Sequence, residues 1–463
     1  MIRYAWFRNI RLPHPVIILL GMLLAAAMMS YFIQAGAFDR EVINGKSTVV
    51  AGTYKFLPQK PLGIMDVFLS IPQGFKTASD IIYIIFASGI MFGFMQDSGA
   101  VENGVGTLIK KLGVHRRYMI VVIMTFLFGS LGIFVGYENN IAMIPFAVLL
   151  SYAIGGDLML AAGISVGAIT VGFGLSPVNP YTLGTGHAIA QLPIYSGALL
   201  RSILCLSSLV FLAWYNVRYL KQLIKNNHQD NHFIQDIDDF RLKKDISAYS
   251  LSARDITILS AFALSIIAIL YGVFMLDWFI THIASVFTML AIILAIISQK
   301  NSEAAGKVVF KSISSVAPGA FMVGLATSIK VVLENGQISD TISYTLANSV
   351  NGLPEHFSGV VMALGQTMMN FVIPSGSGQA LATLPIMIPM GDLVGLSRQC
   401  VVLAFQIGDG VSNLVNPALG GLIAMLAACR VSFDKWLVFI WPVFVIVWII
   451  GVAGLIAGVY TGY

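Results

Sequence analysis

Val178-Asn179-Pro180 is followed, 237 positions later, by Val415-Asn416-Pro417. The same offset carries Asp97-Ser98-Gly99 onto Glu334-Asn335-Gly336, and it places Glu138-Asn139-Asn140 opposite Ser375-Gly376-Ser377. A constant offset across three polar segments of a largely apolar chain indicates an internal duplication. Matched Gly, Pro and Asn interruptions in the two halves of a membrane protein are the sequence pattern that points to a transport site.

The composition indicates a membrane protein. Of 463 residues, 57% are hydrophobic and 11% are charged, whereas soluble domains carry about 25% charged residues. The net charge of +5 lies in short basic clusters between apolar runs, a pattern that orients membrane spans and does not indicate nucleic-acid binding. Three widely spaced cysteines lie in apolar stretches, so we expect neither a disulfide framework nor a zinc site.

Segments long enough to cross a bilayer, about 20 apolar residues, recur along the chain. Two predicted spans, 158–190 and 398–428, are broken at the Asn-Pro segments. Two other stretches, 118–154 and 357–393, are apolar on both sides of a polar tip, and we predict that they are re-entrant hairpins. The uninterrupted predicted spans are 15–35, 80–96, 198–219, 256–275, 279–298, 313–333 and 436–458.

The fold class predicted is an all-α polytopic membrane protein with two inverted-topology repeats, about nine transmembrane helices, two re-entrant hairpins and two broken helices. The first repeat spans 1–219, and a linking helix with the second repeat spans 256–463. Basic loops place the N-terminus and the linker 220–255 in the cytoplasm and the C-terminus outside. Segment 36–79 then lies outside, and its β-prone part, 47–56, is expected to form a small hairpin cap of unassigned function.

The polar segments are the predicted binding site. Helices that end in a Gly, Ser or Asn turn present backbone N–H groups that suit a carboxylate, while freed carbonyls and hydroxyls suit Na⁺. Proline frees a further carbonyl in each broken span, and asparagine supplies both a donor and an acceptor. The predicted substrate-binding residues are Glu138, Asn139, Asn140, Ser176, Asn179, Thr182, Ser375, Ser377, Gln379, Asp409, Asn413 and Asn416.

Two acidic residues fall within predicted membrane segments, where carboxylates are costly and usually functional. Glu138 lies at the first tip, and Asp409 lies seven residues before Asn416. Each could take a proton, hold a cation or receive a substrate ammonium; the bland alternatives are helix capping for Glu138 and a hydrogen-bonded structural role for Asp409. Ion coupling is assigned to these two acids with Asn179 and Asn416. A Na⁺ site is predicted at Asn179, Ser377 and Asn416, with H⁺ as the alternative coupling ion and no other cofactor.

Other charged residues have simpler interpretations. Asp157 and Asp392 lie near the ends of hairpin limbs, where capping or solvation is expected. Lys330 precedes Glu334 by four residues, so a local pair or snorkelling is the simple interpretation, and a counter-charge for a second carboxylate is the alternative. His187 follows the first break and is interpreted as a packing histidine, with titration near neutrality as the alternative.

Three stretches resemble one transporter family: 370–380 (NFVIPSGSGQA), 391–395 (GDLVG) and 405–410 (FQIGDG). They are similar to the YfcC-type transporters, described as basic-amino-acid antiporters and grouped with the four-carbon dicarboxylate anaerobic carriers within the ion transporter superfamily. The resemblance covers nearly the whole chain and is strongest from 313 to 440. It implies an elevator-like mechanism, a homodimer and the bacterial inner membrane. The first tip departs from the family pattern, because Asn139 stands where relatives carry a second acid.

These features predict a secondary active transporter for a small carboxylate-bearing solute, coupled to an ion or to exchange. An amino acid, and in particular a basic one, is favoured over a four-carbon dicarboxylate or other short organic acid, because the site has two acids and no arginine at its centre. An ion channel is the alternative class, although paired broken helices fit alternating access better. An enzyme is disfavoured, since no base is placed near Ser375 or Ser377. The expected partners are the solute and the lipid bilayer, and no nucleic acid.

Overall fold

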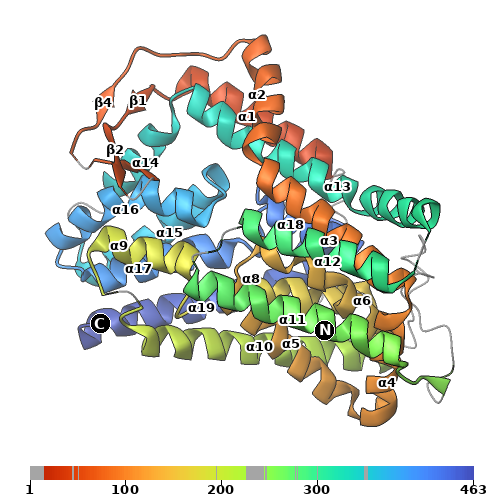
Figure 1. Ribbon diagram of the computed structural model, residues 1–463. Coiled ribbons are helices and arrows are strands. Elements are labelled where there is room, and N and C mark those ends of the chain that lie inside the picture. The colour runs from red at the N-terminus through yellow and green to blue at the C-terminus, as the bar shows by residue number, and fades with distance from the viewer. Residues whose placement is uncertain are drawn as a thin grey trace.

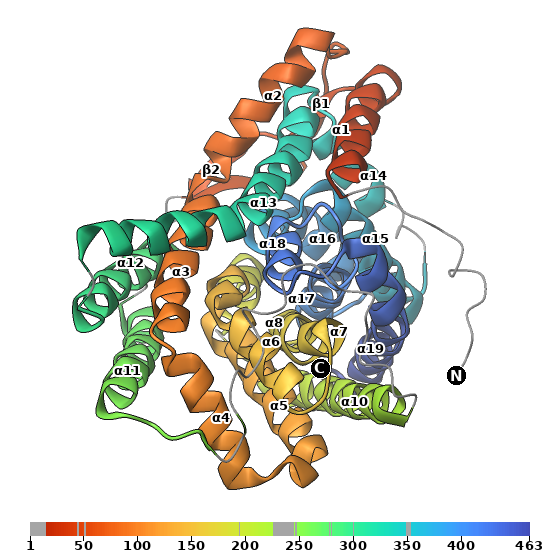
Figure 2. The same cartoon turned by 90° about the vertical axis from the view of Figure 1, so that its right-hand side faces the viewer.

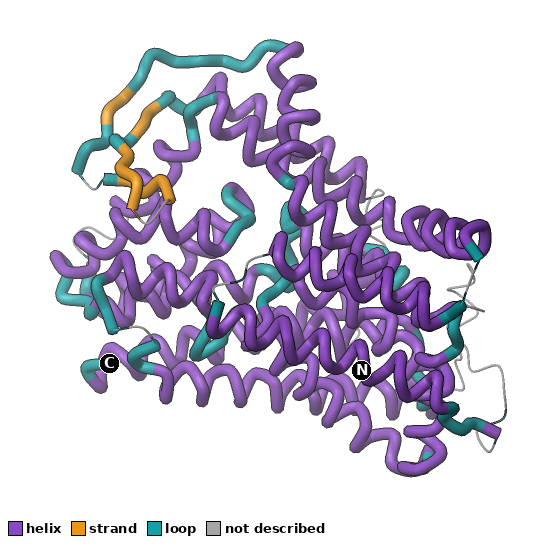
Figure 3. Tube along the Cα trace, viewed as in Figure 1, coloured by secondary structure: helices purple, strands orange, loops and turns teal. Residues whose placement is uncertain are grey.

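The computed structural model describes residues 15–463 except 44–45, 51, 194, 226–244, 246–247, 277, 279, 300 and 349–352. Helices dominate the described residues, and strands are confined to one small region near the N-terminus (Figure 3). The basic residues before position 15 and most of the predicted linker 220–255 lie outside the described residues.

Among the described residues, seven helices are long and apolar enough to cross a bilayer. Six of them coincide with predicted spans, and the seventh, α5, lies in the stretch predicted as a hairpin. Helix α1 (Pro15–Phe32) matches the first predicted span, and its apolar stretch Val16–Phe32 falls just short of the length of the seven. The chain is therefore an all-α, multi-pass membrane protein. The seven helices are α3 (Ser79–Asp97), α5 (Arg117–Val135), α10 (Ala198–Lys225), α11 (Ala253–Met275), α12 (Ile280–Ile297), α13 (Ser302–Asn335) and α19 (Phe433–Thr461).

Both stretches with a polar tip form two helices joined by a short turn. In the first, α5 is followed by η3 (Glu138–Met143) and α6 (Ile144–Ala153). In the second, α15 (Glu355–Val372) is followed by α16 (Gly376–Leu393). Gly136, with φ of 107°, ends α5 in a backbone conformation that suits glycine. The last residues of α5 and α15, 135 and 372, differ by the offset of 237 found in the sequence.

Both predicted broken spans are interrupted where expected. The first contains α7 (Leu158–Ala162), η4 (Gly163–Gly167) and α8 (Ala168–Gly174), and it resumes after Asn179 as η5 (Pro180–Gly184) and α9 (Thr185–Ala190). The second contains α17 (Arg398–Gln406) and η9 (Ile407–Val411), and it resumes as α18 (Gly420–Ala428). The segments η4, η5 and η9 are π-helical, a local widening that is frequent at functional sites.

The two broken spans cross in backbone contact. A Cβ placed on Gly410 of η9 would lie 2.2 Å from the Cα of Gly174 at the end of α8. Only glycine allows this approach, and small residues serve the same purpose at many membrane helix crossings. The crossing brings the residues that precede the first break beside those that precede the second.

The long helices form two groups (Figures 1 and 2). Helix α13 packs against α1, α2 (Ile64–Thr77) and α3, and α12 packs against α3 and α11. Helices α10 and α19 pack against each other and against the turn-joined pairs and broken spans. Contacts of α13 with α18 and of α3 with η3 join the two groups. The described part of the molecule also contains the short helices α4 (Ala100–Leu112) and α14 (Ser339–Asn348).

The small strands lie over α14 in the segment predicted as a cap. Strand β2 (Arg40–Ile43) pairs antiparallel with β3 (Lys46–Val49), and β1 (Gly36–Ala37) pairs with β4 (Lys55–Phe56). Arg40 forms a 2.7 Å ion pair with Asp340 of α14. The predicted hairpin is thus present, although its paired strands begin before position 47 and the later part of 36–79 is helix α2.

Candidate functional site

The second break is organised by one amide side chain, Asn370 near the end of α15. Its Nδ2 lies 2.9 Å from the carbonyl oxygen of Asp409, 2.7 Å from Ser412 Oγ and 2.7 Å from Asn413 Oδ1. Asn416 Nδ2 donates in turn to the Asn370 carbonyl at 2.7 Å, and Asn416 Oδ1 accepts from the Ala418 N–H at 2.9 Å. The asparagine of the second break is therefore fully engaged in holding the break open.

Three buried acceptor oxygens around this break have no donor among the described residues: Asp409 Oδ1, Asn370 Oδ1 and Gln379 Oε1. Gln379 reaches the same helix as Asn370, because its Nε2 donates to Gln366 Oε1 at 2.7 Å. A buried polar group without a partner costs about 1–3 kcal/mol. Oxygens in this condition are chemically suited to a proton or a hard cation.

The first break has the opposite arrangement. Asn179 Oδ1 accepts from the N–H groups of Tyr181 and Thr182, at 2.8 and 3.3 Å, and so caps η5. Its Nδ2 is buried and has no acceptor among the described residues. Ser176 Oγ takes the bridging role, because it donates to the Ile133 carbonyl of α5 at 3.2 Å. The first break thus leaves a donor free.

The second tip meets both breaks at Gly376. A Cβ on Gly376 would lie 2.3 Å from Thr182 Cγ2 and 3.0 Å from Asp409 Oδ2. Ser375 Oγ accepts from the Gly378 N–H at 3.4 Å and caps α16, while Ser377 is half-buried beside it. The structure therefore brings together predicted residues from one tip and from the two broken spans.

The first tip adds two side chains, those of Glu138 and Asn139, to the region where the second tip meets the two breaks. Glu138 is half-buried against Gly421 of α18, where a Cβ would lie 3.0 Å from Glu138 Cγ. It lies near enough to Asp409 for the two charges to interact. Asn139 hydrogen-bonds the side chain of Tyr181. Asn140 turns away, since its Nδ2 donates to the Gly136 carbonyl at the end of α5.

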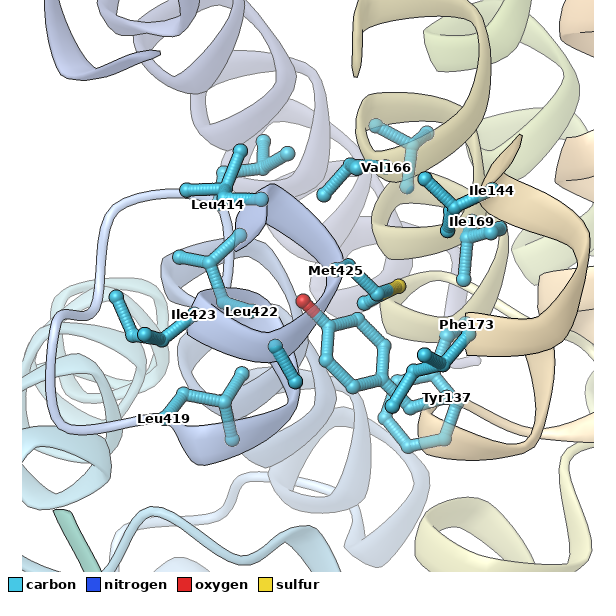
Figure 4. Close-up of a cluster of buried hydrophobic side chains, with 14 of the residues drawn as sticks. Tyr137, Ile144, Val166, Ile169, Phe173, Leu414, Leu419, Leu422, Ile423 and Met425 are labelled. Atoms are coloured by element: carbon cyan, nitrogen blue, oxygen red, sulfur yellow. The ribbon is translucent and has the colours of Figure 1, made fainter. Parts of the chain in front are cut away.

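Apolar side chains form one wall of this region (Figure 4). Tyr137, next to Glu138, lies between Phe173 of α8 and Met425 of α18. Its ring centroid is 5.3 Å from that of Phe173, and its hydroxyl lies 3.1 Å from Thr170 Oγ1. Such a wall limits water and strengthens electrostatic interactions between the site and a ligand.

The charge of the site is acidic. In the part of the chain that the structure describes, neither Glu138 nor Asp409 forms an ion pair with a basic side chain. Among the described residues, no group of three or more His, Cys, Asp or Glu side chains is placed to hold a metal ion. A cation bound here would therefore need amide or carbonyl oxygens in addition to Glu138 and Asp409.

The secondary interpretations from sequence agree with the contacts. Asp157 Oδ1 accepts from the Leu160 N–H at 2.8 Å and caps α7. Lys330 lies 3.6 Å from Glu334, and Arg398 lies 2.9 Å from Asp392. His187 is fully buried, and so are the three free cysteines, Cys205, Cys400 and Cys429.

Sequence reasoning missed three residues that connect the site. Asn370 and Gln406 carried a signal, because each is an amide within an apolar helix. Gln406 Nε2 donates to the Ser176 carbonyl at 2.6 Å and accepts at Oε1 from Arg201 Nε at 2.9 Å. Arg201 is a basic residue near the start of an apolar span, and that position was its signal.

A family model and a sequence relative both place the chain among carriers. The family model described as "C4-dicarboxylate anaerobic carrier" matches residues 12–460. The chain is 32% identical over 400 residues, covering 81% of this chain and 77% of the other, to the "Putative basic amino acid antiporter YfcC" of Escherichia coli (strain K12). Among solved structures, Neisseria gonorrhoeae MtrF, which represents "a Class of Antimetabolite Efflux Pumps", matches with TM-score 0.45 and 16% identity over 98% of this chain and 97% of that one. The Alcanivorax borkumensis YdaH transporter matches with TM-score 0.44 and 13% identity over 97% and 99% of the two chains.

Proposed function

The chain belongs to the C4-dicarboxylate anaerobic carrier family, and from that premise we propose that it is a secondary active transporter of an amino acid, with basic amino acids as the preferred substrates. As a multi-pass membrane carrier it moves a small molecule across a bilayer and is not an enzyme. The observation that carries the substrate proposal is the pair of acids, Glu138 and Asp409, neither of which is in an ion pair among the described residues.

In the proposed binding mode, the two ends of the substrate face opposite partners. The carboxylate accepts from Asn179 Nδ2, which is buried and unpartnered, and from backbone N–H groups at the start of α16, where Ser375 and Ser377 lie. The ammonium group lies toward Glu138. A second cationic group, as in arginine or lysine, lies toward Asp409 while the coupling ion is absent and adds a charge-assisted hydrogen bond that a neutral amino acid lacks, so this group and the ion exclude each other.

Coupling is assigned to the second break. The sequence expectation was a Na⁺ site at Asn179, Ser377 and Asn416. The hydrogen bonds of Asn416 occupy both ends of its amide, so we place the coupling ion at the unpartnered oxygens of Asp409, Asn370 and Gln379 instead. Either Na⁺ held by these oxygens or a proton on Asp409 neutralises the buried charge of the Asp409 carboxylate before the transport unit moves.

We further propose that the α5–α6 and α15–α16 pairs are re-entrant and that the two repeats have inverted topology. Support comes from the helix ends 135 and 372, which keep the sequence offset, and from the two crossing broken spans. The transport unit contains these pairs, the broken spans, α10 and α19. It moves in an elevator-like manner against the group around α13, in a homodimer in the bacterial inner membrane. The N-terminus is cytoplasmic and the C-terminus lies outside.

The family description favours one alternative, a four-carbon dicarboxylate. Two carboxylates would then face Glu138 and Asp409, so at least one acid must be protonated or matched by a cation on binding. This alternative predicts strict dependence of binding on a cation or on low pH.

Substrate-evoked current in proteoliposomes tests the proposal. Purified protein is challenged with arginine, lysine, ornithine, malate and succinate, under an imposed Na⁺ gradient and then an H⁺ gradient. A saturable response to the basic amino acids supports the proposal. A response to malate or succinate alone overturns the substrate assignment and favours the dicarboxylate alternative. Asp392→Asn, which alters an acid that is paired with Arg398 at the surface, is the matched control for Asp409→Asn.

A further inference from the structure

An apolar groove lies over α3, between α12 and the first turns of α13. Helix α3 packs against both of these helices, and the three lie together at the left of Figure 2. The groove has a volume of about 360 Å³. Its lining includes the buried Ala87 and Ala291, and it also includes Ile292 and Ile296, whose exposed fractions are 59% and 70%. The groove is therefore accessible from the surface of the molecule.

Small residues keep the groove open. Ala295 of α12 lines it, as do Ala305 and Gly306 of α13. A Cβ on Gly306 would meet no atom within 4 Å. Small residues in membrane helices usually let two backbones approach closely, but beside Gly306 the space stays unfilled by any described part of the chain. An occupant from outside the chain could use this space.

The lining of the groove is hydrocarbon apart from one pair of hydroxyl groups, those of Tyr83 and Thr288. The Tyr83 hydroxyl lies 3.2 Å from Thr288 Oγ1, which donates to the Ala284 carbonyl at 2.9 Å. Each hydroxyl therefore has a partner within the protein. A polar solute that entered the groove would lose its hydration without compensation, so the lining selects for a hydrocarbon ligand.

The groove runs along about half of a membrane span. On α12 it extends from Thr288, near the middle of the helix, to Ile296 near its end. On α3 it extends from Tyr83 to Phe94, a rise of about 17 Å at 1.5 Å per residue. Half of a hydrocarbon core is about 15 Å thick. The groove thus has the length of one leaflet, which is the depth that a lipid acyl chain occupies.

An arginine without a carboxylate partner lies at the surface end of the groove. Arg254, at the start of α11, donates from Nη2 to the Ser298 carbonyl at 3.3 Å, and this bond holds its guanidinium at the end of α12. Arg254 is exposed and is in no ion pair among the described residues. The other N–H groups of the guanidinium suit a phosphate.

We propose that this groove binds one acyl chain of a phospholipid, with the lipid phosphate at Arg254. The chain extends from the membrane surface along α3 and ends at the Tyr83–Thr288 pair. It fills the space between α12 and α13 and so ties these two helices together across α3. The site rests on the placement of these helices in a bilayer and does not depend on which solute is transported.

A phospholipid that carries a photoreactive diazirine near the end of one acyl chain tests the site. It is added to delipidated protein in detergent and irradiated, and the labelled residues are identified by mass spectrometry. The proposal predicts labelling around Tyr83 and Thr288 that excess unlabelled phospholipid removes. Labelling spread evenly over the exposed faces of α1, α10 and α19 would overturn it.

Filling the groove should weaken lipid binding. Gly306→Phe should reduce the affinity for phospholipid, measured by native mass spectrometry, about tenfold or more, the effect of losing the burial of about two methylene groups. Gly21→Phe is the matched control, because it adds the same ring to an exposed glycine of α1 where a Cβ also meets nothing within 4 Å. It should bind phospholipid like the wild-type protein. Equal affinities for the two variants would place the lipid elsewhere.

The phosphate contact has its own test. Arg254→Gln should weaken the binding of phospholipid but not that of diacylglycerol, which has the same chains and no phosphate. Lys307→Gln is the control, because Lys307 is already paired with Glu303 at 2.8 Å, and it should change neither affinity. If Arg254→Gln bound phospholipid like the wild-type protein, the proposed position of the phosphate would be wrong.

A second copy of the chain is the competing occupant. Ile292→Cys places a thiol on the exposed part of the groove, while the three native cysteines are buried. Oxidation of this variant in native membranes should leave the protein without a disulfide between two copies. Rapid formation of a dimer linked through position 292 would assign the groove to a subunit interface and overturn the lipid site.

Discussion

The two breaks share a sequence pattern and differ in which group each leaves unpaired. At the second break, Asn416 uses both ends of its amide, and the free atom is the carboxylate oxygen of Asp409. At the first break, Asn179 uses only its oxygen, and the free atom is its amide nitrogen. A serine in the first half does the bridging that an asparagine does in the second. The two halves thus share a backbone pattern, but the first break offers a free donor and the second a free acceptor.

This difference suggests a division of labour. A donor suits the carboxylate of a solute, and an acidic acceptor suits a cation. A transporter needs both in one site if binding of the solute is to depend on the ion. The predictions that follow test this division, beginning with the largest expected effect.

Asp409→Asn should reduce coupled transport about 100-fold or more, because removal of one partner of a buried charge interaction costs about 3–5 kcal/mol. Uptake driven by an ion gradient in proteoliposomes is the measurement. Asp392→Asn, at the surface, should transport like the wild-type protein. Normal coupling in the Asp409 variant would place the ion elsewhere.

Gly410→Ala should destabilise the protein by about 3 kcal/mol, near the upper end of overpacking effects, since the added methyl meets the backbone of Gly174. The thermal unfolding midpoint in detergent is the readout. Gly306→Ala is the matched control, because a Cβ on this glycine of α13 meets nothing within 4 Å. An unchanged midpoint for Gly410→Ala would show that the two broken spans do not cross as closely as described.

The same substitution by serine should affect transport at Asn179 and stability at Asn416. Asn179→Ser keeps a short acceptor for the η5 cap and removes the free donor, so the KM for substrate should rise about tenfold with a small change in stability. Asn416→Ser removes the bond to the Asn370 carbonyl and should cost about 1–3 kcal/mol of stability. Transport kinetics and thermal unfolding, measured on both variants, give the comparison. Identical profiles for the two variants would contradict the division of labour.

Lys330→Met should change stability by less than about 1 kcal/mol, because its pair with Glu334 is partly exposed and such pairs contribute little. Transport should be unchanged. A large loss of transport in this variant would mean that Lys330 serves as a counter-charge to a substrate carboxylate, the role that the structure does not support.

The sequence predicted the spans and the interruptions well, because apolar length and Asn-Pro or Gly-Ser interruptions are local signals. Helix α10, for example, begins at residue 198, as predicted. The sequence could not predict which partner each polar group would find. Asn416 and Asn179 look equivalent along the chain. In the structure, Asn416 donates to the carbonyl of Asn370 on α15. The corresponding carbonyl on α5, that of Ile133, accepts from Ser176 and not from Asn179. Arg201 was missed for the same reason, since its partners lie about 200 positions away.

The central claim is that the second break holds the coupling ion and the first holds the solute. The most direct test is the affinity for arginine, measured by calorimetry across a range of Na⁺ concentrations and pH in the wild-type, Asp409→Asn and Asn179→Ser proteins. We predict that the wild-type affinity varies strongly with one of the two cations, that Asp409→Asn binds arginine with no such dependence, and that Asn179→Ser binds weakly but keeps the dependence. An unaltered cation dependence in Asp409→Asn would contradict the account.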